Sequence, residues 1–243
     1  MDPAALDELA AAEERLLLAV SALDDGRSRA PSRLPGWSRG HLVTHLARNA
    51  DGMRNLVAWA STGVVTPMYA SIESRAAGID AGSGRPAAEL VPDLAEAASR
   101  LASTLAAMPA AAEDAVVEIG PSRTPTRGAE LALLRLREVE IHHVDLDLGY
   151  EPADWSEGFV VRTLDQLAPR FRTAAQMPLA HLRDGATGRT WAVSEPGTTD
   201  GELVGPATLL LAWLTGRTAP DAAEAAGLVR TGGGPVPSPA AWL

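Results

Sequence analysis

The sequence predicts an N-terminal bundle of four long helices, followed by a smaller C-terminal α+β domain. Long segments with apolar residues at helical spacing fill the first part of the chain. Shorter, strand-like segments around glycine-containing turns follow them. Short connections between long amphipathic helices are typical of an antiparallel bundle. We therefore place the bundle at residues 1–151 and the small α+β domain at residues 152–243.

The four helices of the bundle are expected at 3–23, 40–61, 86–108 and 127–148. In the first, the apolar residues recur at roughly helical spacing: Leu6, Leu9, Leu16, Val20 and Leu23. Ser38 is a good N-cap for the second helix, and Gly149 is a good stop for the fourth. We also expect a short helix at 71–80 and a strand-like or extended run in "DAVVEIG".

The second domain begins with a helix over 157–175. "AHLRDGATGRTWAVS" has the pattern of two short strands around a turn, and "GELVGPATLLLAWLTGR" joins a strand to a helix. The tail ends in Trp-Leu, which predicts that the C-terminal end packs against the protein.

Charge and composition exclude several classes of function. The chain of 243 residues has a formal net charge of −10, which repels phosphate backbones, and no polybasic run that would hold an anionic membrane. It has no cysteine, so disulfides, thiolate metal ligands and a protein thiol nucleophile are ruled out. The N-terminal segment lacks the pattern of a signal peptide, and no uncharged stretch could span a membrane. We expect a cytoplasmic protein, monomeric or a small homo-oligomer.

Two predicted helices carry the residues that suggest chemistry. In "LRLREVEIHHVDLDLG", Glu138 and His142 are four residues apart and share a helix face. His41 and His45 have the same spacing on the second helix. A site could combine one imidazole from the second helix with the carboxylate and imidazole of the fourth. Two histidines and one carboxylate with an open position are typical of catalytic zinc or ferrous iron.

Spacing alone leaves alternatives open. Charged and imidazole side chains four residues apart also occur on ordinary solvated helices. The apolar stripes do not choose between His142 and His143, and His41 could replace His45. Glu140 and His143 form a second possible couple.

The remaining candidates each have a structural interpretation beside the functional one. Arg48 and Asn49 could shape the site or cap neighbouring polar groups. Tyr69 lies on a loop that could close a pocket or anchor packing. We expect Trp37 to fasten its loop to the bundle, and His181 to lie on a strand without a catalytic role.

Longer motifs resemble one family. "LPGWSRGHLVTHLARNADGMRNLVAWASTG", followed by "TPMYAS", resembles the N-terminal part of the mycothiol-dependent maleylpyruvate isomerases, members of the DinB-like superfamily of metal-binding four-helix bundles. "REVEIHHVDLDLG" resembles the second metal motif of that family, and "TGR" with the closing "WL" resembles its C-terminal domain. The resemblance extends over essentially the whole chain and is strongest over residues 34–71 and 135–149.

The resemblance implies a set of site residues. His45, Glu138 and His142 would hold a divalent metal, usually zinc, which leaves His41 and His143 as neighbours. The family also needs an arginine in its C-terminal domain, which by alignment of "LTGRT" corresponds to Arg217. His45 and Arg217 are therefore the expected catalytic residues, with Arg217 binding a substrate carboxylate. The residues that bind mycothiol are not indicated.

The reaction implied is the cis–trans isomerisation of maleylpyruvate to fumarylpyruvate, a step of the gentisate pathway of aromatic catabolism. A thiolate adds to the conjugated double bond, the resulting single bond rotates, and elimination restores the double bond as trans. The absence of cysteine fits, because mycothiol would bring the sulfur, with its pKa lowered by the metal or by a metal-bound base. The metal could instead act as a Lewis acid on the carbonyl.

Two other functions remain open. The same bundle and ligands would suit a mycothiol S-transferase acting on another electrophile, in detoxification or biosynthesis, because a fold does not determine a reaction. A non-catalytic binding or regulatory protein with a vestigial bundle is the third possibility, and a metal-free purified protein would favour it.

Overall fold

A computed structural model of the chain describes residues 2–120, 123–172 and 177–239. The chain divides into two compact units, Met1–Gly149 and Tyr150–Leu243. The N-terminal unit is helical and the C-terminal unit combines helices with a small sheet, which confirms the predicted fold class. Across the described part of the chain, no helix combines the length and the apolar character needed to span a membrane.

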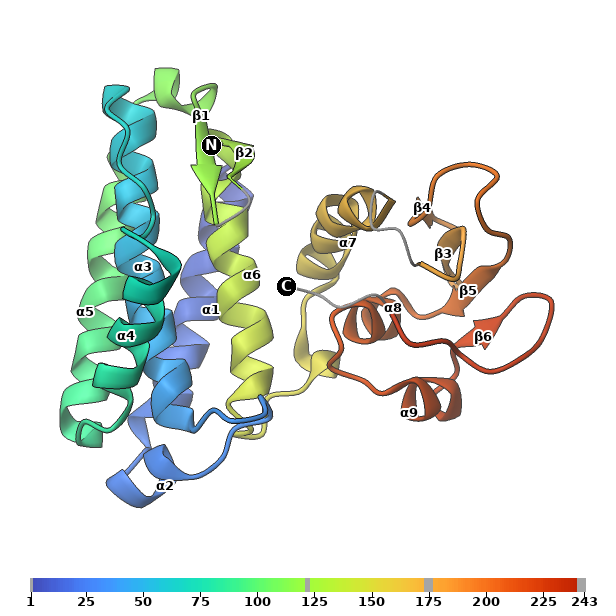
Figure 1. The fold of residues 1–243 in the computed structure, drawn as a ribbon, viewed down its shortest axis with the longest axis horizontal. Helices are drawn as coiled ribbons and strands as arrows, with labels where there is room; N and C mark the ends of the chain where they lie inside the picture. The colour runs from blue at the N-terminus through green and yellow to red at the C-terminus, as the bar shows by residue number, and fades with distance from the viewer. Residues whose placement is uncertain (1, 121–122, 173–176, 240–243) are drawn as a thin grey trace. The chain divides into compact units, whose positions relative to one another are not determined.

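Four long helices lie side by side in the N-terminal unit, as the sequence predicts (Figure 1). They are α1 (Pro3–Ser21), α3 (Arg39–Thr62), α5 (Ala87–Ala106) and α6 (Leu131–Asp145). Helix α3 packs against both α5 and α6 and against the shorter α4 (Ile72–Ser83). Fully buried leucines along these helices form the core, among them Leu16, Leu42, Leu46, Leu56, Leu94, Leu101 and Leu131.

The ends of α3 are defined by local chemistry. Ser38 is its N-cap, as predicted, and the Ser38 hydroxyl accepts a hydrogen bond from the backbone N–H of His41 at 3.3 Å. Gly63 ends the helix in the left-handed conformation, with φ of 73°. These caps fix where the helix begins and ends.

The start of α6 differs from the prediction. Strands β1 (Val116–Ile119) and β2 (Thr124–Arg127) form an antiparallel hairpin, and a 3₁₀ turn, η2 (Gly128–Glu130), follows. The helix therefore begins at Leu131 rather than near 127, because Arg127 is paired with β1 and Gly128–Glu130 form the 3₁₀ turn. The short helix α2 (Asp25–Arg29) and the 3₁₀ turn η1 (Ala110–Glu113) also have no counterpart in the prediction.

A buried arginine joins three helices of the bundle. Arg135 on α6 has no exposed side-chain surface, and its Nε donates to Glu13 Oε1 of α1 at 2.7 Å. Its Nη1 donates to the Leu46 carbonyl and to Asn49 Oδ1, both on α3 and both at 2.8 Å. A buried charge requires such partners, so these bonds specify how α6 sits against α3.

The C-terminal unit contains a four-stranded sheet in the order β4-β3-β5-β6. Strand β3 (His181–Asp184) pairs antiparallel with β4 (Thr190–Ala192) and parallel with β5 (Glu202–Gly205), and β5 pairs antiparallel with β6 (Val229–Arg230). The helices of this unit are α7 (Glu157–Arg172), α8 (Ala207–Leu214) and the short α9 (Pro220–Ala225), with the 3₁₀ turn η3 (Pro152–Asp154) before them.

The predicted strands and helices of this unit are all present. The structure also contains α9 and β6, which were not predicted. The end of the predicted helix at 173–175 and the closing Trp-Leu lie outside the described residues. The segment just before the C-terminal end does pack, because Val236 is buried and Trp213 Nε1 of α8 donates to the Pro237 carbonyl at 2.7 Å.

Candidate metal centre

Three side chains from two helices converge inside the bundle. His45 comes from α3, and Glu138 and His142 come from α6. One donor atom from each of them lies within 4.8 Å of the others. The Nε2 atom of His45 is 3.1 Å from Glu138 Oε2, and the Nε2 atom of His142 is 3.6 Å from the same oxygen. The two imidazoles and the carboxylate therefore face a common point.

The three side chains differ in their exposure to solvent. The side chain of His45 is 3% exposed, that of His142 is 13% exposed and that of Glu138 is 28% exposed. The carboxylate thus lies on the side from which a small molecule can approach, while the imidazoles are fixed by the bundle.

Burial and hydrogen bonding set the charge of each ligand. Burial lowers the pKa of His45 to about 4, although the hydrogen bond with Glu138 partly opposes this effect. Burial alone would raise the pKa of Glu138, but hydrogen bonds from His142 and His45 outweigh it and hold that pKa well below its ordinary value. At neutral pH His45 is uncharged and Glu138 is ionised, which are the forms that bind a metal ion.

Asp145 orients His142. Its buried Oδ2 lies 2.8 Å from His142 Nδ1, so the opposite ring nitrogen, Nε2, is directed at Glu138. Burial alone would lower the pKa of His142, but the hydrogen bonds to Asp145 and Glu138 raise it. A carboxylate at the second ring nitrogen is the usual partner of a metal-binding histidine.

The structure separates the alternatives that spacing left open. His41 belongs to the N-terminal cap of α3: its Nδ1 lies 2.7 Å from the Ser38 hydroxyl and accepts from the Ser38 backbone N–H at 3.2 Å. Glu140 is buried and pairs with Arg15 of α1 at 2.7 Å. His143 is buried outside the group of converging donors. The face of α6 that meets His45 therefore carries Glu138 and His142.

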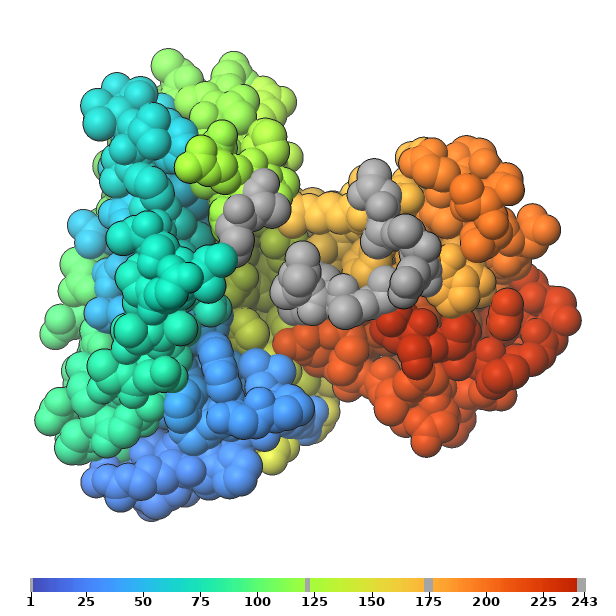
Figure 2. Space-filling model, viewed as in Figure 1, coloured from blue at the N-terminus to red at the C-terminus, as the bar shows by residue number. Residues whose placement is uncertain are grey.

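Residues other than the three donors also line the group. The Trp37 ring centroid lies 5.7 Å from that of His45, edge-on, so Trp37 covers this imidazole as well as fastening its loop. Arg75 on α4 places Nη2 at 3.3 Å from His45 Nδ1, and its guanidinium carbon lies 5.7 Å from the Tyr69 ring centroid. Sequence reasoning did not single out Arg75. The α4 segment, drawn in teal, lies on the outer surface of the bundle (Figure 2).

The other candidates have different places. Asn49 accepts from the buried Arg135. Arg48 pairs with Asp93 of α5 at 2.6 Å and with Asp51 of its own helix at 3.2 Å, so it forms ion pairs away from the group of donors. His181 is exposed on β3. Arg217 follows α8 in the C-terminal unit, is half-buried, and donates to the Thr215 carbonyl at 2.5 Å.

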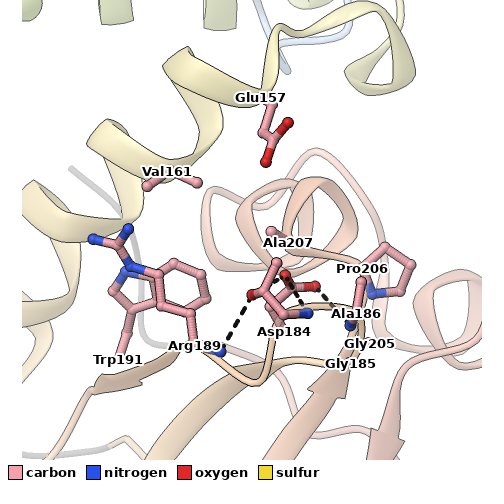
Figure 3. Close-up of a pocket in the computed structure, with 11 residues that line it drawn as sticks. Glu157, Val161, Asp184, Gly185, Ala186, Arg189, Trp191, Gly205, Pro206 and Ala207 are labelled. Carbon is pink, nitrogen blue, oxygen red and sulfur yellow. Dashed lines mark hydrogen bonds between the residues drawn. The ribbon is translucent and has the colours of Figure 1, made fainter.

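The C-terminal unit has a cavity of its own, of about 480 Å³ (Figure 3). Two of its charged residues, Asp184 and Arg189, are already engaged by neighbours. Asp184 accepts from the backbone N–H groups of Ala186 and Thr187 and from the Thr187 hydroxyl, and Arg189 binds both oxygens of Asp165. Glycine, alanine and proline make up much of the remaining wall, and Glu157 adds a carboxylate to it.

The donor set of the bundle suits a divalent metal. Two imidazoles and one ionised carboxylate form a three-ligand site that keeps a position open, as catalytic zinc sites do. The uncharged state of His45 and the carboxylate behind His142 match what such a site requires. The observed residues therefore fit the ion that the two motifs suggested.

Comparison with known proteins gives a consistent result. The family model for the mycothiol maleylpyruvate isomerase N-terminal domain matches residues 9–147. A crystal structure of the mycothiol-dependent maleylpyruvate isomerase superposes with a TM-score of 0.87 at 26% sequence identity, covering 98% of this chain and 95% of that one. A histidine-to-alanine mutant of that enzyme matches equally well, with the same TM-score, identity and coverage. Comparison with curated protein sequences gives no significant match. The chain belongs to the mycothiol maleylpyruvate isomerase family.

Proposed function

We propose that the protein is a metal-dependent and mycothiol-dependent isomerase that converts maleylpyruvate to fumarylpyruvate by thiol addition, bond rotation and elimination. The observation that carries this proposal is the extent of the likeness to the solved isomerase, which covers 98% of this chain and so includes both units. A match to the bundle alone would support the metal site without supporting the reaction.

His45, Glu138 and His142 would hold the metal, which we propose to be zinc. When bound, mycothiol would supply the thiol that adds to the double bond, and the metal would lower the pKa of that thiol or polarise the substrate carbonyl. His45 contributes an uncharged imidazole, and Glu138 balances part of the positive charge with its carboxylate. Asp145 keeps His142 in the orientation that the site needs.

Arg217 is the proposed binding residue for a substrate carboxylate. A guanidinium can bind a carboxylate through two parallel hydrogen bonds, which fixes the orientation of the substrate as well as adding affinity. The half-burial of its side chain leaves part of it accessible to such a ligand.

The test compares two histidine variants from the same bundle. Purified wild type, His142→Ala and His41→Ala are analysed for metal content, and loss of maleylpyruvate is followed with and without mycothiol. We expect wild type to contain stoichiometric metal and to isomerise the substrate when mycothiol is present. His142→Ala should lose both properties, because two of the three ligands do not hold the ion.

His41→Ala is the matched control, since His41 serves the helix cap and not the donor group. It should keep its metal and its activity while losing about 1 kcal/mol of stability. Metal without isomerisation in the wild-type protein would instead indicate the mycothiol S-transferase, and a metal-free active wild type would contradict the metal site.

A further inference from the structure

An arginine beside the candidate ligands has no acidic partner. Among the described residues, no carboxylate forms an ion pair with Arg75, whereas Arg48 and Arg85 both pair with Asp93. Arg75 is half-buried, and the contacts of its guanidinium are His45 Nδ1 and the face of Tyr69. The planar guanidinium has the geometry to bind a carboxylate through two parallel hydrogen bonds.

The contact between Arg75 and His45 is not the usual support of a metal ligand. A histidine that binds metal through Nε2 keeps a proton on Nδ1 and donates it to an acceptor, as His142 does to Asp145. A guanidinium has only donors. When His45 binds a metal through Nε2, its Nδ1–H and Arg75 therefore face each other as two donors, and Arg75 must take its acceptor elsewhere. Its positive charge also opposes a cation at this place.

The segment that carries Tyr69 and Arg75 is held closely against α3. A Cβ on Gly52 would lie 2.7 Å from Met68 Cγ and 2.9 Å from the Met68 carbonyl oxygen, so only glycine lets this loop approach the helix. Asn55 Nδ2 donates to the Pro67 carbonyl at 3.3 Å. Gly82, near the end of α4, packs directly on Thr44 in the same way. The position of Arg75 beside His45 is thus built by the fold.

We propose that Arg75 and Tyr69 form an anion subsite beside the metal ligands, which takes a carboxylate group of the substrate. The guanidinium supplies two parallel donors and the phenol a third. Burial raises the pKa of Tyr69, Glu138 adds to the effect and Arg75 only partly opposes it, so the phenol keeps its proton at neutral pH. The proposal deepens the proposed function and rests on it for the identity of the substrate, a dicarboxylate.

The experiment separates anion binding from metal binding. Maleate, a small dicarboxylate, is titrated into the zinc-loaded full-length protein by calorimetry, and zinc affinity is measured separately by competition with a chromophoric chelator. Arg75→Met and Arg75→Lys are compared with Arg100→Met, which removes an exposed arginine of α5 that pairs with Asp51 and Glu96. Thermal unfolding checks that each variant is folded.

In Arg75→Met we expect maleate affinity to fall by about 10- to 100-fold, as for the loss of a charged, paired hydrogen bond. Zinc affinity should stay equal or rise, because a positive charge is removed. Arg75→Lys should lie between, since it keeps the charge and loses the paired donors. Arg100→Met should resemble wild type in both measurements.

Two results would overturn the subsite. One is a fall in zinc affinity with unchanged maleate affinity, which would make Arg75 a support of His45. The other is an equal loss of maleate affinity in Arg100→Met, which would reduce the effect to surface charge. Neither measurement needs turnover, so a protein that binds maleate through Arg75 but does not isomerise would leave the subsite standing and refute the proposed reaction.

Discussion

At the scale of single residues, the candidate centre depends on which ring nitrogen of each histidine is engaged. His142 has a carboxylate behind it, and His45 has a guanidinium behind it. These opposite partners give the two imidazoles different tasks. The orientation of His142 is fixed by Asp145. The hydrogen bond between Arg75 and His45 Nδ1, by contrast, must break when His45 binds a metal through Nε2.

Asp145→Asn tests the first of these tasks. The amide keeps the shape of Asp145 but removes its charge, so the basicity and orientation of His142 should suffer. We expect metal affinity to fall by about 10- to 100-fold, the range for the loss of such an outer partner. Chelator competition measures it, with Asp147→Asn as the control because Asp147 pairs with Arg33 and Arg39 instead. Equal affinity in Asp145→Asn and wild type would contradict an orienting role.

Some residues of the candidate site could be predicted from the sequence and others could not. The donor spacing and the resemblance pointed to His45, Glu138 and His142, and these three converge. Spacing by itself could not prefer His45 to His41, because both lie on one helix face. Ser38 held a local signal, since a cap residue followed three positions later by a polar side chain forms a reciprocal cap. Arg75 gave no local signal, because its contact with His45 exists only in the folded bundle.

At the scale of secondary-structure elements, the register of α6 against α3 decides whether the donors meet. Arg135 is three positions before Glu138 on α6. Its partners on α3, Leu46 and Asn49, are one and four positions after His45. A slip of α6 by one residue would rotate Glu138 away from His45 by about 100°. The buried guanidinium makes such a slip costly, because its partners would be lost.

Arg135→Met should therefore destabilise the protein strongly. Removing one partner of a buried ion pair leaves Glu13 without its charge partner, and we expect a loss of about 3–5 kcal/mol in the free energy of unfolding. Urea denaturation measures this value. The double variant Glu13→Gln/Arg135→Met should recover part of the loss, because the uncompensated charge is also removed. A loss below about 1 kcal/mol, typical of a surface pair, would contradict this account.

The same scale explains which elements the sequence could predict. The long helices have enough turns for their apolar stripe to stand out, so α1, α3, α5 and α6 were found. Strand β2 was not predicted, and its last residue, Arg127, was taken as the start of α6, because the four residues "TPTR" have no alternating pattern and gain their structure from pairing with β1. The elements α2, α9 and β6 are also too short to produce a periodic signal.

At the scale of the whole molecule, the two units divide the proposed work. All three donor residues lie in Met1–Gly149, which has its own core, and Arg217 lies in Tyr150–Leu243. If both units contribute to the reaction, the first unit alone should bind the metal, whereas activity should require both units.

A fragment of residues 1–149 tests this division. We expect the isolated bundle to bind zinc with an affinity within about tenfold of the full chain and to show no isomerase activity with mycothiol. Full-length Arg217→Met is the companion variant, which should keep zinc and lose most of its turnover. Undiminished activity in either protein would refute a role of the C-terminal unit in the reaction.

The long separation between the two donor helices has one more consequence. His45 and Glu138 are 93 positions apart along the chain. These two residues are not close together in an unfolded chain, so an ion bound by both would be a tertiary cross-link that forms only after the helices have docked. Binding of the ion would then require the docked helices, and a bound ion would in turn stabilise the folded bundle.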